Sequence, residues 1–327
     1  MSVNTLSYHP ITRREWLRRA GVLSGGAVLV GVLPEWAFAF HGQPAAATDQ
    51  LAAMRNGMGA TPVTSASLGP NLTMLAGPGG NVVVLNGADG KVVVDTFVQP
   101  AWPNLKAALD KLGNQKISTV IDTHWHFDHA DNNGAFRKEG AQIVAHDNTK
   151  KRMSEAHDLL GAKFPPSPAD ALPTQTFAAT RRIDANGDQL MLGKIPNAHT
   201  DTDIFIKFPK ANVLHLGDVF FNGMYPFIDA STGGSIGGMI DGTNFSMKQA
   251  DASTKIVPGH GPLGDLKSLT AYRDMLVTVR DRIAKLKKSG QSLKEVLSAS
   301  PTKDLDATWG KGFMQPNDFL AIVYNTL

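Results

Sequence analysis

The sequence contains no cysteine among its 327 residues. Disulfides, thiolate nucleophiles and cysteine-ligated zinc or iron–sulfur sites are therefore excluded, and the chemistry must come from His, Asp, Glu, Ser, Lys and Tyr. Long apolar runs are also missing. Apart from one N-terminal candidate, no predominantly apolar, charge-free stretch reaches the ~18–20 residues that a membrane-spanning helix needs. With 42% hydrophobic and 19% charged residues, the chain can bury a sizeable core, so a wholly disordered protein is excluded.

An excess of positive charge is also lacking. Lys plus Arg number 32 and Asp plus Glu 29, a formal net charge of +3. A nucleic-acid-binding protein needs a basic stripe, but the basic residues form only short clusters, such as 150–152 and 285–288, that are typical of solvated helix faces. We therefore expect no nucleic-acid partner.

The N-terminus resembles a twin-arginine export signal, with Arg13-Arg14 in the run Thr12–Arg18. An uncharged, glycine-containing segment from Ala20 to Pro34 follows, and then the A-x-A cleavage pattern Ala37-Phe38-Ala39. The pattern predicts that residues 1–39 are a signal peptide, recognised by the Tat export machinery and removed after Ala39. We expect a periplasmic protein with no stable membrane span after cleavage; an uncleaved anchor is the alternative.

The rest of the chain divides into three parts. Residues 40–66, rich in Ala, Gly, Pro and Gln, predict a leader or linker. Alternating β-rich runs and helical patterns predict an α/β catalytic domain over 67–265, in which strands followed by strand-and-helix units occur twice. From Leu266 to Leu286 apolar residues recur every three or four positions, which predicts an amphipathic helix of ~20 residues in a C-terminal helical extension, 266–327, packed on the same domain.

Two segments have weaker patterns. Residues 147–160 predict one polar helix, and residues 222–243, which contain six glycines, predict a long loop. Within that loop the run Gly233–Gly238 lacks the Gly-Lys-Ser/Thr ending of a phosphate-binding loop. We expect it to be flexible backbone near the site.

A dense group of metal-binding residue types follows the predicted strand 117–121. His124, His126 and His129 lie within six residues, with Asp128 among them. In extended backbone His124 and His126 point to the same side, and a turn after them can bring Asp128 and His129 to the same point. Imidazole and carboxylate donors suit zinc and neighbouring transition metals.

Three later residues also lie at the ends of apolar runs: His199, Asp218 and His260. In a layered α/β protein, strand ends are where ligands converge. Five His and two Asp exceed the needs of one tetrahedral ion. They suit two metals ~3.5–4 Å apart that share one carboxylate.

The motifs H-x-H-x-D-H, a downstream His, G-D and P-G-H-G occur in this order over about residues 68–265, and they resemble the metallo-β-lactamase-fold hydrolase superfamily. The resemblance implies an αβ/βα four-layer sandwich with the metal site at one edge. It also implies two metal positions: His124, His126 and His199 at one, Asp128, His129 and His260 at the other, and Asp218 between them. This ligand set is closer to the glyoxalase II-like and lactonase-like branch than to the true zinc β-lactamases, which puts a β-lactam as the natural substrate in doubt.

These features predict a hydrolase with two Zn²⁺, or other divalent transition metals, whose bridging hydroxide opens an acyl bond in a small molecule. Cyclic amides and esters, β-lactam-like or lactone-like, are the leading substrates. Asp128 either moves the proton or serves only as a ligand, and Asn222 and Tyr225 are candidate substrate contacts. A glyoxalase II-like thioesterase is the nearest alternative, although its dependence on cytoplasmic glutathione adducts conflicts with export; a phosphodiesterase and a non-hydrolytic metal-binding or relay protein of the periplasm are the others.

Overall fold

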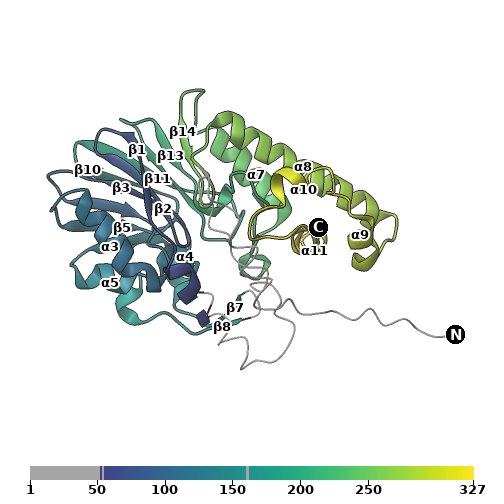
Figure 1. The fold of residues 1–327 in the computed structure, drawn as a ribbon, viewed down its shortest axis with the longest axis horizontal. Helices are drawn as coiled ribbons and strands as arrows, with labels where there is room; N and C mark the ends of the chain where they lie inside the picture. Colours follow the sequence, from purple (N-terminus) through teal and green to yellow (C-terminus); the bar gives the residue numbers. More distant parts are fainter. Residues whose placement is uncertain (1–51, 54, 160–161) are drawn as a thin grey trace, which may run out of the picture. The chain divides into compact units, whose positions relative to one another are not determined.

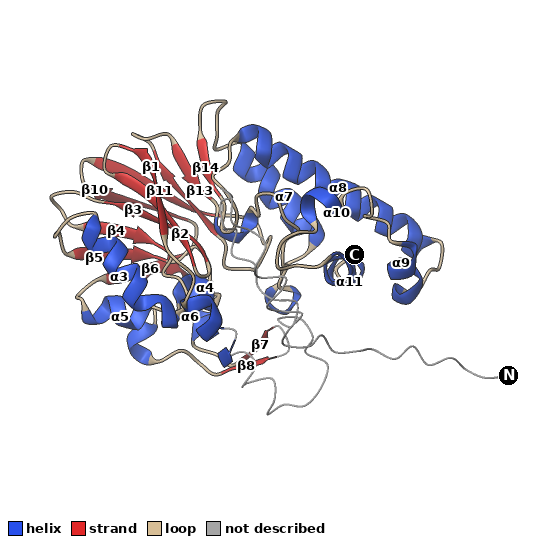
Figure 2. Ribbon diagram, viewed as in Figure 1, coloured by secondary structure: helices blue, strands red, loops and turns tan. Residues whose placement is uncertain are grey.

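The computed structural model describes residues 52–53, 55–159 and 162–327. Its main elements are two β-sheets packed face to face, with helices on their outer faces (Figures 1 and 2). The predicted signal peptide, residues 1–39, lies outside the described residues. None of the described helices is both long enough and apolar enough to cross a membrane.

The first sheet has seven strands in the order β1-β2-β3-β4-β5-β6-β9. Pairing is antiparallel from β1 to β4 and parallel from β4 to β9. The strands are β1 (Thr64–Gly69), β2 (Leu72–Gly77), β3 (Gly80–Leu85), β4 (Lys91–Val94), β5 (Ile117–Ile121), β6 (Gln142–His146) and β9 (Gln175–Phe177). The helices of this half are α3 (Trp102–Lys111), α4 (Phe127–Ala130), α5 (Asn133–Lys138) and α6 (Asp147–Met153).

The second sheet has five strands in the order β10-β11-β12-β13-β14, with only the β13–β14 pair parallel. They are β10 (Thr180–Ala185), β11 (Asp188–Lys194), β12 (Ile204–Phe208), β13 (Val213–His215) and β14 (Lys255–Val257). Helix α7 (Ile236–Met247) lies between β13 and β14 in the chain, and β14 is followed by α8 (Leu266–Lys288), α9 (Leu293–Ala299), α10 (Asp306–Trp309) and α11 (Pro316–Asn325).

Strand β3 shows how the layers form. Successive side chains of a strand point to opposite faces, so Val83 joins the core between the two sheets, with Leu190 and Ile206. Its neighbour Val84 joins the cluster between the first sheet and helix α3, with Leu105. A strand that is buried on both faces needs a continuous apolar run. The predicted αβ/βα four-layer sandwich and the C-terminal helices are confirmed.

Helix α8 confirms the predicted amphipathic helix. It begins at the capping box of Asp265 and Ser268, which satisfies backbone N–H groups that the first turn leaves unpaired. Its apolar stripe is buried, including Tyr272, Leu276 and Ile283. The Tyr272 ring lies 5.4 Å from the Phe220 ring, in the loop after β13.

The secondary structure predicted for two segments is wrong. The polar helix predicted over 147–160 ends at Met153 and is followed by a small hairpin of β7 (His157–Leu159) and β8 (Ala162–Phe164). Leu159 and Phe164 of this hairpin pack in an apolar cluster with Trp125. Local polarity did not reveal this long-range contact.

The long loop predicted over 222–243 contains the first two turns of α7, which begins at Ile236. Its glycines permit close packing rather than disorder: a Cβ at Gly242 would lie 2.7 Å from Ala198 Cβ. Strand β1 likewise begins at Thr64, within the range predicted as a linker.

Candidate metal centre

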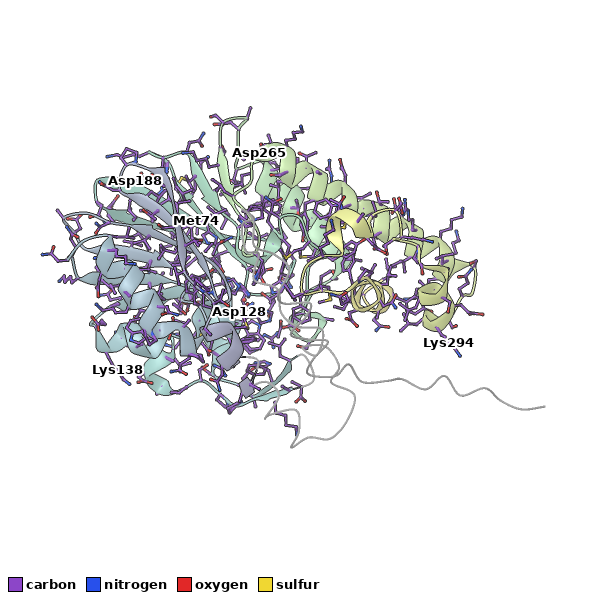
Figure 3. All side chains as sticks on the ribbon, in the orientation of Figure 1. Met74, Asp128, Lys138, Asp188, Asp265 and Lys294 are labelled. Atoms are coloured by element: carbon purple, nitrogen blue, oxygen red, sulfur yellow. The ribbon has the colours of Figure 1, made fainter. Side chains whose placement is uncertain are left out.

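The predicted metal ligands gather at one edge of the sandwich because each follows the end of a strand. His124 and His126 follow β5, and the chain then turns into α4, which carries Asp128 (Figure 3). The other ligands follow the ends of strands in the second sheet: His199 after β11, Asp218 after β13 and His260 after β14. Since β13 and β14 are parallel neighbours, their carboxyl ends meet at the same edge.

One group of four donors consists of His124, His126, His199 and Asp218, whose ligand atoms all lie within 4.8 Å of one another. His199 Nε2 lies 2.8 Å from His126 Nδ1, and Asp218 Oδ2 lies 3.5 Å from His199 Nε2. All four residues are buried.

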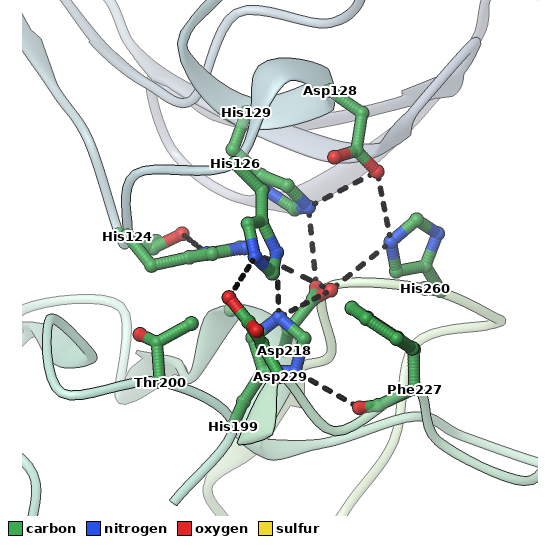
Figure 4. Close-up of polar contacts among 12 residues, drawn as sticks. His124, His126, Asp128, His129, His199, Thr200, Asp218, Phe227, Asp229 and His260 are labelled. Atoms are coloured by element: carbon green, nitrogen blue, oxygen red, sulfur yellow. Dashed lines mark hydrogen bonds and ion pairs between the residues drawn. The ribbon is translucent and has the colours of Figure 1, made fainter. Parts of the chain in front are cut away.

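A second group consists of Asp128, His129 and His260, again within 4.8 Å of one another. Asp128 Oδ2 lies 3.4 Å from His260 Nε2 and 3.6 Å from His129 Nε2. Asp218 reaches this group too, with Oδ1 3.2 Å from His129 Nε2 and Oδ2 3.4 Å from His260 Nε2 (Figure 4). The structure thus brings all seven predicted ligands together, in two groups with Asp218 between them.

The donor atoms fit a bound cation. His124 Nε2, His129 Nε2 and Asp218 Oδ1 are buried without a hydrogen-bond partner among the described residues. Buried polar atoms in proteins are normally paired, and leaving them unpaired costs free energy. Nitrogen and carboxylate donors that converge in this way suit divalent ions of the zinc type, and the two groups are consistent with a dinuclear site.

The charges also fit. Burial, and then the neighbouring His129, lower the pKa of His124 well below its ordinary value, and burial lowers the pKa of His199. Both rings are therefore neutral, as metal ligands must be. Burial opposes ionisation of Asp218, but the surrounding imidazoles, first that of His260, outweigh it and hold the pKa of Asp218 well below its ordinary value. Burial alone would lower the pKa of His260, yet the carboxylates of Asp218 and Asp128 raise it to about 9, so a bound cation would have to displace a proton from this ring.

Four groups that are not ligands bind the far side of the imidazoles. Asp95 Oδ2 lies 2.7 Å from His129 Nδ1, and Asp229 Oδ2 lies 3.1 Å from His126 Nε2. The Phe227 carbonyl oxygen lies 2.9 Å from His199 Nδ1, and Thr123 Oγ1 lies 3.1 Å from His124 Nδ1. Each acceptor fixes the ring tautomer so that the other nitrogen is free to bind a metal.

Sequence reasoning missed these four groups. A signal existed for Asp95, which ends the apolar run 91–95 as the ligands end theirs. No comparable signal marked Asp229, which lies in the long loop predicted over 222–243.

Residues 227–235 of this loop are hydrogen-bonded to and packed against the residues of the metal centre. The Asp229 N–H donates to the His199 carbonyl at 3.0 Å. The Asp229 carboxylate accepts hydrogen bonds from the backbone N–H of Ser231 and the hydroxyls of Ser231 and Thr232. A Cβ at Gly234 would overlap the His199 carbonyl. The prediction of flexible backbone over Gly233–Gly238 is therefore wrong: Gly234 and Gly238 permit close approach to the ligand loop, and α7 begins at Ile236.

Two glycines near the shared carboxylate have the same role. A Cβ at Gly259, in the P-G-H-G motif, would overlap Asp218 Oδ1. Gly80 has a positive φ of 111°, and a Cβ there would overlap the Gly259 carbonyl oxygen. The β2–β3 turn is thereby packed directly against the loop that carries His260.

The predicted substrate contacts lie beside the ligand loops. Asn222 is half-buried, and its Nδ2 donates to the Pro262 carbonyl at 2.8 Å. Tyr225 is fully buried: its hydroxyl donates to Asp306 Oδ1 at 2.8 Å and its ring stacks on Phe319. The structure therefore places Tyr225 in the packing between the Asp218 loop and the C-terminal segment, and substrate binding by Asn222 stays a prediction.

Comparison with known proteins supports this geometry. The family model described as the Metallo-beta-lactamase superfamily matches residues 76–278. Among curated proteins, none matches the chain.

Several solved structures share the fold. A metallo-beta-lactamase from Pontibacter korlensis has a TM-score of 0.56 and 18% identity, over 65% of this chain and 98% of that one. A metallo-beta-lactamase from Hirschia baltica has a TM-score of 0.53 and 20% identity, over 66% and 98%. The sec-alkylsulfatase Pisa1 from Pseudomonas sp. has a TM-score of 0.60 and 16% identity, over 90% of this chain and 55% of that one.

Proposed function

Since this chain belongs to the metallo-β-lactamase superfamily and has an intact metal-binding cluster, we propose that it is a dinuclear zinc hydrolase that opens an acyl bond. Cyclic amides and esters are the leading substrates. The observation that carries the proposal is the position of Asp218, whose two oxygens face both groups of imidazoles. A carboxylate placed in this way suits a pair of ions rather than one.

The proposed cofactor is two Zn²⁺, held by His124, His126, His199 and Asp218 on one side and by Asp128, His129, His260 and Asp218 on the other. When bound, such a pair activates a water molecule and stabilises the negative charge that develops on a carbonyl oxygen. The chain's own contribution is to orient the donors and to exclude water from all but one side.

Asp128 is the proposed proton carrier. Its side chain is 14% exposed, whereas that of Asp218 is 5% exposed, so Asp128 is the carboxylate nearer the open side. Burial opposes ionisation of Asp128, but the imidazoles of His129 and His260 hold its pKa below its ordinary value. Asp128 Oδ2 is thus an ionised acceptor within reach of a substrate at the centre, as a general base requires.

The test is a substrate panel on the zinc-loaded chain: nitrocefin, an acyl-homoserine lactone, a thioester, a nitrophenyl phosphodiester and a secondary alkyl sulfate. Turnover of the lactone or nitrocefin supports the proposal, turnover of only the thioester, the phosphodiester or the sulfate replaces it, and no turnover with metal bound favours a binding protein. One variant and its control accompany the panel. His126→Ala removes a proposed ligand and should abolish turnover. The control His157→Ala removes a half-buried histidine outside both groups and should retain turnover.

The same proposal includes export by the twin-arginine route and work in the periplasm, on the strength of the Arg13-Arg14 motif and the A-x-A pattern at Ala37–Ala39. Replacing both Arg13 and Arg14 by Lys should retain the protein inside the cell, whereas the same change at Arg18 and Arg19 should not. N-terminal sequencing of the exported protein should begin at residue 40, and another start would refute cleavage after Ala39.

A further inference from the structure

Among the described ligands, Asp128 and His260 have the most exposed side chains. The side chains of His124, His129 and His199 are at most 1% exposed, and that of Asp218 is 5% exposed. Those of Asp128 and His260 are 14% and 15% exposed. A substrate therefore reaches the centre past Asp128 and His260.

Aromatic rings pack against imidazoles of both ligand groups. The Phe313 ring lies 5.5 Å from the His260 ring, and the Phe221 ring stacks on the His260 ring at 5.1 Å. The Phe227 ring lies 5.9 Å from the His126 ring and 5.8 Å from the His199 ring. In Figure 4 the Phe227 side chain points toward the ligands.

Phe227 and Phe313 are both half-buried, unlike Phe221, which is fully buried. Each is therefore a partly exposed apolar ring in contact with a ligand imidazole, Phe313 with His260 and Phe227 with His126 and His199. Apolar walls with a few convergent polar groups are typical of small-molecule binding sites.

Both rings are held in place from behind. Phe313 belongs to the C-terminal segment. This segment is held by a hydrogen bond from the Tyr225 N–H to the Trp309 carbonyl oxygen, at 2.8 Å. Gly312, the neighbour of Phe313, packs so closely that a Cβ there would lie 2.6 Å from Met224 Cβ. The Phe227 backbone is held by the bond from His199 Nδ1 to its carbonyl. Rings that are ordered before binding lose little entropy when a ligand packs on them.

We propose that Phe227 and Phe313 form the apolar wall of a substrate subsite at the metal centre, with Phe313 next to His260 and Phe227 next to His126 and His199, so that the acyl substrate carries an aromatic or branched apolar group beside its scissile carbonyl. The C-terminal segment would then be part of the active site. The proposal rests on the proposed function for the reaction, but the wall itself can be tested without any turnover.

The test compares two thiols, 2-phenylethanethiol and 2-mercaptoethanol, binding to the zinc-loaded chain by isothermal titration calorimetry. A thiolate binds zinc directly, so both probes anchor at the centre whether or not the chain is a hydrolase. They differ only in a phenyl or a hydroxyl group. Removing about 100 Å² of apolar surface from water corresponds to a preference for the phenyl compound on the order of 50-fold.

Phe313→Ala should reduce this preference to below about 10-fold while leaving 2-mercaptoethanol binding and zinc content unchanged, and Phe227→Ala should reduce the preference by a similar factor. Phe313→Leu should retain most of it, because a leucine still presents an apolar surface. Phe245→Ala is the matched control, since Phe245 is a half-buried phenylalanine of α7 that contacts Phe205. It should leave the preference intact.

The wall is refuted if the wild-type chain shows no preference, or if both alanine variants keep it. A preference that holds in a chain that hydrolyses nothing would support the subsite and overturn only the proposed reaction. Hydrolysis of the acyl substrates without any preference for the phenyl compound would support the proposed reaction and overturn the subsite.

Discussion

Replacing Asp229 by Asn tests how the chain holds its metals. Asp229 is 2% exposed and accepts a hydrogen bond from His126 Nε2 at 3.1 Å. Burial opposes its ionisation, but the bonds from His126, Ser231 and Thr232 hold the pKa of Asp229 far below its ordinary value. It is therefore an anion at any working pH. Asn has the same shape but no charge, and it can turn its amide N–H toward His126, which would favour the wrong ring tautomer.

The expected loss is confined to one group of ligands. Replacing the partner of a metal-binding imidazole costs 10–100-fold in metal affinity, or about 1.4–2.8 kcal/mol. In Asp229→Asn this loss should fall on the ion held by His124, His126 and His199. The other ion should bind nearly as before, because His129 keeps its own carboxylate partner, Asp95.

The assay is competition between the metal-free chain and a zinc chelator, with one tight and one weakened equivalent expected in Asp229→Asn. The matched control is Asp201→Asn. The Asp201 carboxylate is half-buried and binds Arg152 rather than a ligand imidazole, so its loss should leave both equivalents tight. Two wild-type equivalents in Asp229→Asn, or an equal loss at both with an unchanged melting temperature, would refute the reasoning.

Metal analysis of the loaded chain should find close to two zinc ions, and a clean single equivalent would contradict the sharing of Asp218. His126→Ala and His260→Ala should abolish turnover and lower the melting temperature, because bound metal adds to the folding free energy; turnover that survives in both would leave the ligand assignment without support. Gly259→Ala should displace Asp218 and reduce the zinc content, whereas Gly57→Ala, where a Cβ meets open space, should not. Zinc binding at pH 7 should release protons, measured by calorimetry in buffers of different ionisation enthalpy, because the carboxylates raise the pKa of His260 to about 9. In the metal-free chain this imidazolium contributes to the free energy of unfolding. That contribution is fully present below the ordinary pKa of 6.5 and should be lost as the pH rises through about 9. Proton release on zinc binding that stays unchanged above pH 9 would contradict the raised pKa of His260.

Local pattern sufficed for much of the fold. The apolar runs of β3, β5 and β12 predicted strands because a strand buried on both faces has almost no polar position. The apolar residues of α8 predicted a helix because they recur every three or four positions, which places them on one face of a helix. The hairpin β7–β8 and helix α7 escaped prediction because packing on distant residues, such as Trp125 and Ala198, decides them.

The sequence by itself determined the seven candidate ligands, because each is a donor that closely follows the end of a strand and strand ends converge at one edge of the sandwich. Only the tertiary structure decided which groups hold those donors and what surrounds them. Asp229 and His126 are 103 residues apart, and Phe313 reaches His260 from the C-terminal segment. Such contacts depend on how the loops and helices pack, which no local spacing encodes.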